Sequence, residues 1–155
     1  MPFLLSLYCG LPQVRLQPLD GVIRAAATMI GGVPKFEHIG EFMRDTLHWL
    51  PARQRIHYRL STIFWLCVLG IEPTYLLELF ILTSSCTGRQ SLRSASRGDF
   101  VVPHARTAIK QHTCRAFSIV GPSVWNSLPS EIRSLPRNLS SSFYKLLKTF
   151  IFARA

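Results

Sequence analysis

Residues 47–82 constrain the fold more than any other stretch, because they join a basic segment to a long apolar one. Proline is favoured in the first turn of a helix and glycine just past its end, so Pro51 and Gly70 predict one helix over residues 51–69. An apolar stripe at helical spacing runs along this helix and consists of Ile56, Leu60, Ile63, Phe64 and Cys67. We therefore expect the helix to pack in the core of a mainly α fold.

Three arginines lie near the start of this helix, at Arg53, Arg55 and Arg59. The positive end of the helix dipole favours anions there, so cations gain no stability from this position. One interpretation is a solvated charged face, and the other is a surface that holds a phosphate backbone. The residues alone leave both interpretations open.

The charge of the chain is positive and unevenly spread. Eighteen Lys and Arg residues against eight Asp and Glu residues give a net charge of +10. The balance is +1 as far as Thr83 and +9 from Ser84 onward. Such an asymmetry indicates a polyanionic partner, which is either nucleic acid or an acidic membrane surface.

Helical periodicity predicts further helices on both sides of the central one. Those before residue 83 are expected over residues 19–30, 39–47 and 73–82. The inward residues are Leu19, Val22, Ile23, Ala26, Met29 and Ile30 in the first of these helices, and Tyr75, Leu76, Leu79 and Phe80 in the last. The C-terminal helix starts at Ser140 or Ser141, with an inward face of Phe143, Leu146, Leu147, Phe150 and Ile151 and an outward pair of Lys145 and Lys148.

The composition changes after this first group of helices. Residues 83–98 are rich in Ser and Arg and poor in large apolar side chains, which is typical of a loop or linker. A chain of 155 residues that is 48% hydrophobic is long and apolar enough to bury a core. We expect a helical, thumb-like bundle over residues 1–82, the linker, and a small basic α+β extension over residues 99–155.

Two short stretches in the C-terminal part favour strands. Residues 100–103 and 116–120 together predict a hairpin, and Gly121 with Pro122 predicts a turn after it. Ser123 is then expected to cap a short helix. The fold class predicted from the sequence is therefore mainly α, a small helical bundle with a basic loop and a short β-hairpin before the C-terminal helices.

No recognisable catalytic constellation is present in the sequence. It holds no Gly-rich phosphate loop, no nucleophile elbow and no aspartate pair of the kind that a two-metal polymerase needs. Four residues could be assembled into a metal site on paper, namely Cys86, His104, His112 and Cys114, but their spacing matches no common zinc finger. We expect no enzyme activity, no cofactor and no metal.

A membrane protein is an alternative to a nucleic-acid-binding protein. Residues 60–82 have the length of a membrane span, but Gly70, Glu72, Pro73 and Glu78 interrupt them, so two packed core helices are the preferred interpretation. The N-terminus lacks the positively charged start of a signal peptide. We expect a nuclear or cytoplasmic protein, and a membrane-associated protein with a basic tail on anionic lipid is the alternative.

Six motifs follow one another in an order that resembles a known family. They are LHWLPARQRIHYRL at 47–60, LGIEPTYLLEL at 69–79, SLRSA at 91–95, VVPHART at 101–107, RAFSIVGPSVWNSLPSEIR at 115–133 and SSFYKLLKTFIF at 141–152. Together they resemble the region beyond the polymerase palm of LINE-type, non-LTR retrotransposon reverse transcriptases of the jockey-like sort. Two earlier segments, YCGLP at 8–12 and VIRAAATMIGGVPKFEHI at 22–39, resemble the segment after the last polymerase motifs in the same polyproteins.

The resemblance implies a non-catalytic fragment of an RNA-directed DNA polymerase. Its thumb-like helical bundle and C-terminal extension would lie against the template-primer duplex. The polymerase core of the parent polyprotein, with its catalytic aspartates, would precede Met1, and the endonuclease domain is also missing. The missing core is therefore an expected partner, and no catalytic residue carries over to this chain.

Eight arginines are the predicted contacts to an RNA or DNA backbone, including that of an RNA–DNA hybrid. They are Arg53, Arg55, Arg59, Arg89, Arg93, Arg97, Arg106 and Arg115. Trp49, Tyr58 and Trp125 are candidates for stacking on bases, although a Trp between apolar neighbours more often belongs to a core. A helical product with no specific ligand is the remaining alternative.

Overall fold

The computed structural model describes residues 6–32, 34, 38–88, 90–103, 116–138 and 141–154. This part of the chain is mainly helical, as predicted, and contains eight α-helices and no β-strand. The α-helices are α1 (Gln13–Gly31), α2 (Ile39–Glu41), α3 (Ala52–Val68), α4 (Thr74–Leu77), α5 (Arg93–Ser96), α7 (Phe117–Asn126), α8 (Ser130–Arg133) and α9 (Ser141–Phe152). A π-helical turn, η2 (Phe42–Thr46), continues α2, and a short 3-10 helix, η3 (Thr83–Ser85), follows α4.

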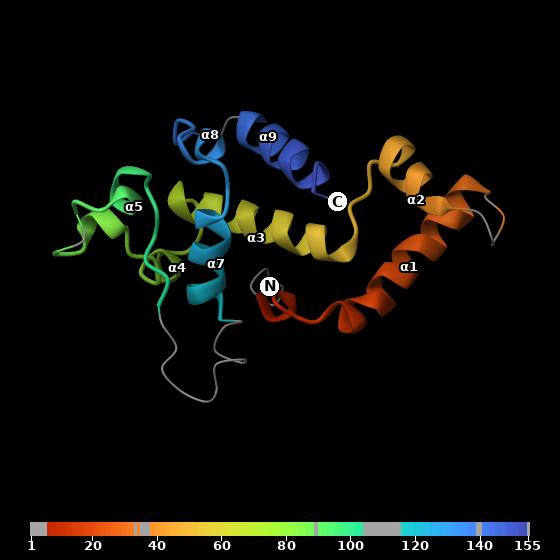
Figure 1. The fold of residues 1–155 in the computed structure, drawn as a ribbon, viewed down its shortest axis with the longest axis horizontal. Helices are drawn as coiled ribbons and strands as arrows, with labels where there is room; N and C mark the ends of the chain where they lie inside the picture. Colours follow the sequence, from red (N-terminus) through yellow and green to blue (C-terminus); the bar gives the residue numbers. More distant parts are fainter. Residues whose placement is uncertain are drawn as a thin grey trace.

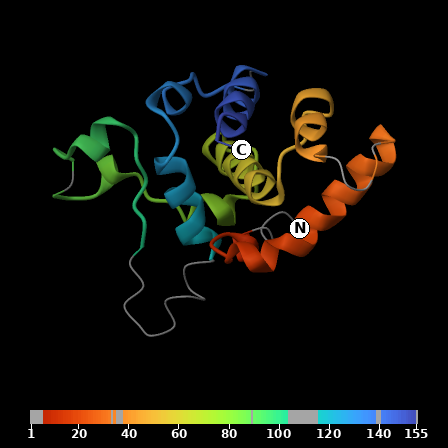
Figure 2. The same ribbon diagram turned by 45° about the vertical axis from the view of Figure 1, so that its right-hand side comes forward.

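Helix α3 lies at the centre of the molecule, where α9 runs antiparallel along it and α7 crosses it steeply (Figure 1). Contacts at the two ends of α3 fix the direction of α9. The amide of Gln54 donates to the carbonyl of Arg154, and Trp65 stacks on Phe143. Helix α1 begins beside the start of α3 and extends away from it together with α2 (Figure 2).

The bounds predicted for the central helix are confirmed. Pro51 precedes the first helical residue, and Gly70 follows the last turn with a φ of 73°. This φ lies in the left-handed region, which glycine adopts without the steric cost that a side chain would add. The helix therefore starts and stops where its punctuating residues predict.

Helix α3 buries two opposite faces, which explains its central place. All five residues of the predicted stripe are buried, namely Ile56, Leu60, Ile63, Phe64 and Cys67. Trp65 lies about 180° around the helix from Ile56 and is only 1% exposed. The stripe packs on Leu16 of α1, Leu76 of α4 and the α7 residues Phe117, Val120 and Val124. Burial also raises the pKa of the Cys67 thiol to about 12, which agrees with its predicted place in the core.

Trp65, Trp125 and Phe143 form an aromatic stack that joins three helices, and each of the three rings contacts the other two. The Trp65 ring is 5.9 Å from Trp125 of α7 at an interplanar angle of 13°, and 4.4 Å from Phe143 of α9 at 9°. Around the stack lie Leu50, Phe64, Phe100, Leu128, Ile132, Leu147 and Ile151. The core thus combines residues from before and after the predicted linker, and the division of the chain into three parts stays a prediction.

The predicted hairpin is wrong, because residues 117–120 belong to helix α7 and Ala116 is the residue before its first turn, so no strand forms there. Gly121 and Pro122, predicted to form a turn, are both buried inside the same helix, and Ser123 does not cap a helix there. A short apolar run has no period that separates strand from helix. Pro122 removes one backbone hydrogen bond from the helix, and the burial of Phe117, Val120 and Trp125 in the core offsets this loss.

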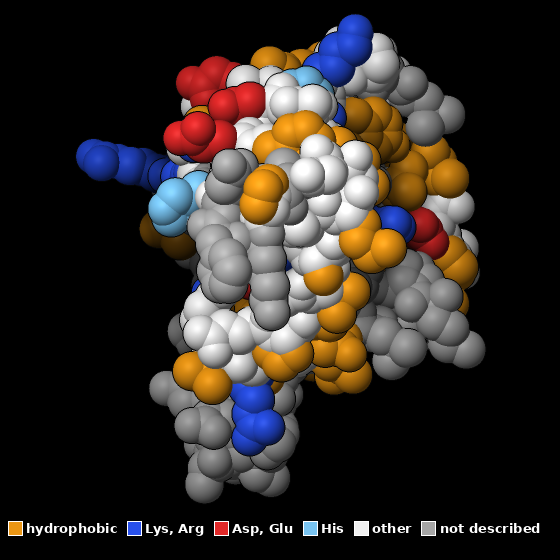
Figure 3. All heavy atoms as spheres, turned by 90° about the vertical axis from the view of Figure 1, so that its right-hand side faces the viewer, with side chains coloured by type: hydrophobic (Ala, Val, Ile, Leu, Met, Phe, Trp, Pro, Cys, Tyr) orange, Lys and Arg blue, Asp and Glu red, His pale blue; other side chains and the backbone are white. Residues whose placement is uncertain are grey.

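Helix α1 turns much of its predicted inward face toward solvent. Leu16 and Ala27 are buried, whereas Leu19, Val22 and Ile30 are exposed and Met29 is 85% exposed. Figure 3 shows hydrophobic side chains at the surface on the side of the molecule where α1 ends. Of the predicted inward residues, Ile23 and Ala26 are half-buried, and Ile23 packs beside Ala27. The rest of this face has no neighbour, because α1 extends past the N-terminal end of α3 (Figure 1).

Helix α4 is shorter than predicted and buries only part of its predicted inward face. It ends at Leu77, before residue 82, and it buries Leu76 while Tyr75 and Leu79 are exposed. Helix α9 matches its prediction more closely, with Phe143, Leu147 and Ile151 buried and Lys145 and Lys148 exposed, although Leu146, which was predicted to face inward, is 43% exposed. Because α9 is 12 residues long, its apolar repeat is a clearer signal than the single turn of α4 can give.

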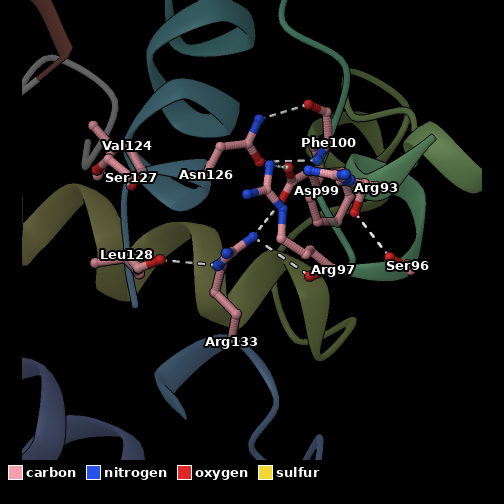
Figure 4. Close-up of polar contacts among 10 residues, drawn as sticks. All are labelled: Arg93, Ser96, Arg97, Asp99, Phe100, Val124, Asn126, Ser127, Leu128 and Arg133. Carbon is pink, nitrogen blue, oxygen red and sulfur yellow. Dashed lines mark hydrogen bonds and ion pairs between the residues drawn. The ribbon is translucent and has the colours of Figure 1, made fainter. Parts of the chain in front are cut away.

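The other predicted strand forms a single bridge. Phe100 pairs with Leu82 in an isolated antiparallel bridge, in which the Val101 N–H donates to the Ile81 carbonyl at 2.8 Å. On its other side, the Asn126 side chain of α7 accepts from the Phe100 N–H at 2.9 Å and donates to the Phe100 carbonyl at 2.8 Å (Figure 4). A side-chain amide therefore takes the place of the strand that the hairpin would have supplied.

We predict that Gly121→Ala destabilises the protein, because α7 approaches α3 most closely at this glycine. An added Cβ would lie 2.9 Å from Cδ2 of Phe64, whose ring is fully buried and cannot move aside cheaply. Thermal or denaturant unfolding should show a loss of about 1–3 kcal/mol.

The matched control is Gly21→Ala in α1, where an added Cβ meets nothing within 4 Å. This change should stabilise the protein by about 0.5–1 kcal/mol, because alanine favours helix more than glycine does. Equal effects of the two substitutions would contradict the close approach of α7 to Phe64.

Candidate nucleic-acid interface

The three arginines predicted on α3 do not share one face. Arg53 and Arg55 are separated by about 200° around the helix, whereas Arg55 and Arg59 lie one turn apart on the same side. Arg53 turns toward the N-terminal segment, where its Nε donates to Gln13 Oε1 at 3.2 Å and its Nη2 to the Leu11 carbonyl at 3.3 Å. The structure therefore brings two of the three together.

Arg53 borders a groove of mixed charge between α1, α2 and the start of α3. The groove has a volume of about 700 Å³, and Asp20, Arg24, Glu41 and Arg44 also line it. Asp20 accepts the Ala52 N–H at 2.8 Å, so an α1 carboxylate caps the start of α3 and complements its dipole. Two acidic groups in this groove oppose the approach of a polyanion.

Arg55 and Arg59 present their charges on the other side of α3. The Arg55 guanidinium lies over the Trp49 ring, 5.4 Å from its centroid, and its Nε donates to the Leu50 carbonyl at 2.9 Å. Both arginines are exposed. The contacts to Trp49 and Leu50 hold the Arg55 side chain in place but leave its charge in solvent.

Helix α9 adds an aromatic and basic edge beside these arginines. The pKa of Tyr58 is raised by burial and then by the nearby Tyr144 of α9, against a smaller lowering by Arg59. Farther along α9, Lys148 Nζ lies 5.4 Å from the centroid of the Phe152 ring. Phe152 in turn contacts His48 edge to face, with centroids 6.4 Å apart.

These residues form one surface, which we call the α3–α9 basic strip. It consists of Arg55, Arg59 and Lys148 with the half-buried aromatic residues Trp49, Tyr58 and Tyr144. None of its three cations forms an ion pair with another residue that the structure describes. Exposed cations beside aromatic faces can contact phosphates and bases at the same time.

The remaining predicted arginines fall into two groups. Arg93 and Arg97 are exposed on or beside α5, and Arg97 Nη2 forms an ion pair with Asp99 at 3.0 Å that offsets part of its charge. Arg89, Arg106 and Arg115 lie outside the described residues. The backbone-binding role of all eight arginines stays a prediction.

Asp99 holds the segment after α5 against α8, a role that the sequence did not reveal. It lies between Arg97 and Arg133, and Arg133 also donates from Nε to the Leu128 carbonyl at 2.9 Å (Figure 4). The side chains of Asp99 and Arg133 are only 8% and 7% exposed. Arg133 is thus a structural cation, although its charge adds to the basic C-terminal part.

Trp125 cannot stack on bases, because it is only 3% exposed and belongs to the central aromatic stack. The structure therefore corrects one of the three predicted stacking candidates, and Trp49 and Tyr58 keep partial exposure in the strip. The apolar neighbours of Trp125 were a signal for a core position, as the sequence also allowed.

Two other classes of site concern metals and membranes. Of the four residues that could be combined into a metal site, His104, His112 and Cys114 lie outside the described part of the chain. Within the described part, no three His, Cys, Asp or Glu side chains gather closely enough to hold an ion. Among the described helices, none combines the length and the apolar character needed to cross a membrane.

Comparison with known protein families, with curated proteins and with solved structures gives no match to this chain.

We predict that Asp99→Ala strongly destabilises the fold, because it leaves the buried Arg133 guanidinium without its carboxylate. Removal of one partner from a buried pair typically costs about 3–5 kcal/mol, which denaturant unfolding would measure. Asp45→Ala is the control, since Asp45 pairs with Arg44 at 3.0 Å where both side chains are largely exposed.

The control should leave the free energy of unfolding almost unchanged, because solvent screens an exposed pair. An Asp99→Ala protein as stable as the Asp45→Ala protein would contradict the proposed role of Asp99 in holding α8.

Proposed function

We propose that the protein binds the backbone of RNA or DNA without regard to sequence, through the α3–α9 basic strip. The observation that carries the proposal is the arrangement of Arg55, Arg59 and Lys148, three exposed cations without ion-pair partners among the described residues, beside half-buried aromatic rings. The net charge of the whole chain, +10, also favours a polyanionic ligand.

The geometry of α3 supports contact with consecutive phosphates of one strand. Arg55 and Arg59 are neighbours on the helix surface, so two planar guanidinium groups can donate to successive phosphate groups. Trp49 and Tyr58 offer ring faces beside them, and stacking on a ring is tolerant of base identity. Contacts of these two kinds position a strand but read little sequence.

The resemblance to the region beyond the palm of non-LTR reverse transcriptases supports an RNA–DNA hybrid as the ligand. A thumb-like region of that family lies against the template-primer duplex, and a central helix with exposed arginines suits that role. On this proposal the polymerase core of the parent polyprotein is a further partner. Binding requires no catalytic group of the chain, because phosphate contacts alone supply the affinity through release of counterions.

A salt titration of binding to a labelled RNA–DNA hybrid tests this proposal. We expect affinity to fall steeply with salt, equally for two hybrids of unrelated sequence. The double substitution Arg55→Ala/Arg59→Ala should weaken binding and reduce the slope of log affinity against log salt by about 2, since each lost phosphate contact removes about 1.

The control is Arg15→Ala/Arg24→Ala, which removes the same charge from exposed positions on α1. It should change the slope much less. If both double variants lose affinity equally, net charge and not the strip governs binding. If a folded, monodisperse wild-type chain does not bind at low salt, the nucleic-acid proposal fails, and a liposome co-sedimentation assay then tests the lipid alternative.

A further inference from the structure

The α3–α9 pair has a second side, which encloses a small pocket. The pocket lies between α3, α7 and α9 and has a volume of about 180 Å³. Its apolar wall consists of Val124, Leu128, Phe150 and Ile151. Sites for drug-sized ligands usually measure roughly 300–1,000 Å³, so this pocket suits a smaller molecule.

Ser61 of α3 is among the residues that line this pocket, and its hydroxyl has no hydrogen-bond partner among the described residues. The residue is only 1% exposed, and its Oγ atom is buried without a donor or acceptor within reach among the described residues. Buried polar atoms in folded proteins are nearly always paired, so an unpaired one needs an explanation. A ligand atom that accepts from this hydroxyl would supply the missing partner.

His57 lies one helical turn before Ser61 and lines the same pocket. Burial lowers the pKa of His57, and the nearby Arg53 charge lowers it further, so the environment favours the neutral ring. A neutral imidazole offers one donor and one acceptor. Polar groups for a ligand thus lie along one edge of α3, opposite the apolar wall.

The charges around the pocket are positive. Arg53 and Arg154 line it, and the Arg154 guanidinium lies 4.2 Å from the centroid of the Phe150 ring, which holds it beside the apolar wall. No acidic side chain is among the described residues that line the pocket. This electrostatic field favours an anion over a neutral or cationic ligand.

We propose that the pocket binds a small carboxylate with a compact apolar body, such as an aromatic or branched short-chain acid. The apolar body packs on Leu128, Phe150 and Ile151, and a carboxylate oxygen accepts the hydrogen bond of Ser61. Arg154 and Arg53 offset the negative charge. This binding is independent of the α3–α9 basic strip, which lies on the other side of the helix pair.

Benzoate is the probe and benzamide is its neutral counterpart of the same shape. Calorimetry or ligand-observed NMR with the full chain should show saturable benzoate binding at millimolar concentration, and weaker binding of benzamide. Ser61→Ala should weaken benzoate binding about tenfold, because a hydrogen bond to a charged group is lost. The same change should raise the melting temperature of the free protein, because it removes an unpaired buried hydroxyl.

The matched control is Ser123→Ala at an exposed position of α7, which should leave benzoate binding unchanged and raise stability only by the greater helix propensity of alanine, an effect that both substitutions share. Opposite effects of Ser61→Ala on stability and on benzoate affinity would support a ligand role for the hydroxyl. Equal binding of benzoate by Ser61→Ala, equal binding of benzamide and benzoate, or no saturable binding to a folded chain would each overturn the proposal.

The His57 ring provides a second readout, because NMR can measure its titration. The charged or titratable groups around it are Arg53 on its own helix, Arg154 beyond α9, and Tyr8 and Cys9 of the N-terminal segment, while α7 adds none among the described residues. A bound carboxylate should raise the pKa of His57, because an opposite charge favours the imidazolium form. An unchanged His57 titration under saturating benzoate would place the carboxylate elsewhere and overturn the assignment.

Discussion

The mutual packing of Trp65, Trp125 and Phe143 is the interaction on which the rest of the structure depends. These nearly parallel rings fix α7 and α9 on α3. The core cluster around these rings includes residues of α3, α7, α8 and α9 but none of α1. Two indole N–H groups are buried there without partners among the described residues, a cost that the apolar area of the rings must exceed. Because α3 is buried on two faces, the two flanks of the α3–α9 pair remain for ligands. One flank carries the α3–α9 basic strip, and the other carries the small pocket.

Helices could be predicted from the sequence where they were long enough to show an apolar repeat, or where a proline or glycine marked an end. Pro51 and Gly70 delimit α3 as expected, and the pattern of α9 identified its buried side. The prediction failed at residues 116–120, where four apolar residues around Ser118 are too few to separate a strand period from a helix period, and packing against α3 decides for helix. It also failed for the outer face of α1, because periodicity shows that a helix has an apolar side but not whether a neighbour reaches it.

The candidate site was partly predictable, because exposed arginines on α3 follow from sequence but their grouping does not. Arg53 differs from Arg55 and Arg59 only by its angle around the helix, and its partners come from residues some 40 positions away. Tyr144 of α9 meets Tyr58 of this surface through tertiary packing alone, and Lys148 lies one helical turn after Tyr144. The pairing of Asp99 with Arg133 and the unpaired Ser61 hydroxyl are likewise products of long-range contact, for which local sequence carries no signal.

The aromatic stack also sets the order in which this core can form during synthesis. Trp65 leaves the ribosome well before Trp125 and Phe143, the two rings that cover it. Until those later residues emerge, α3 exposes an indole on one face, and helix propensity alone rarely holds an isolated helix of this length in water. The first half of the nascent chain therefore cannot complete the core until α7 and α9 have been synthesised. Until then its exposed apolar surface carries a risk of aggregation, and the core forms in one cooperative step.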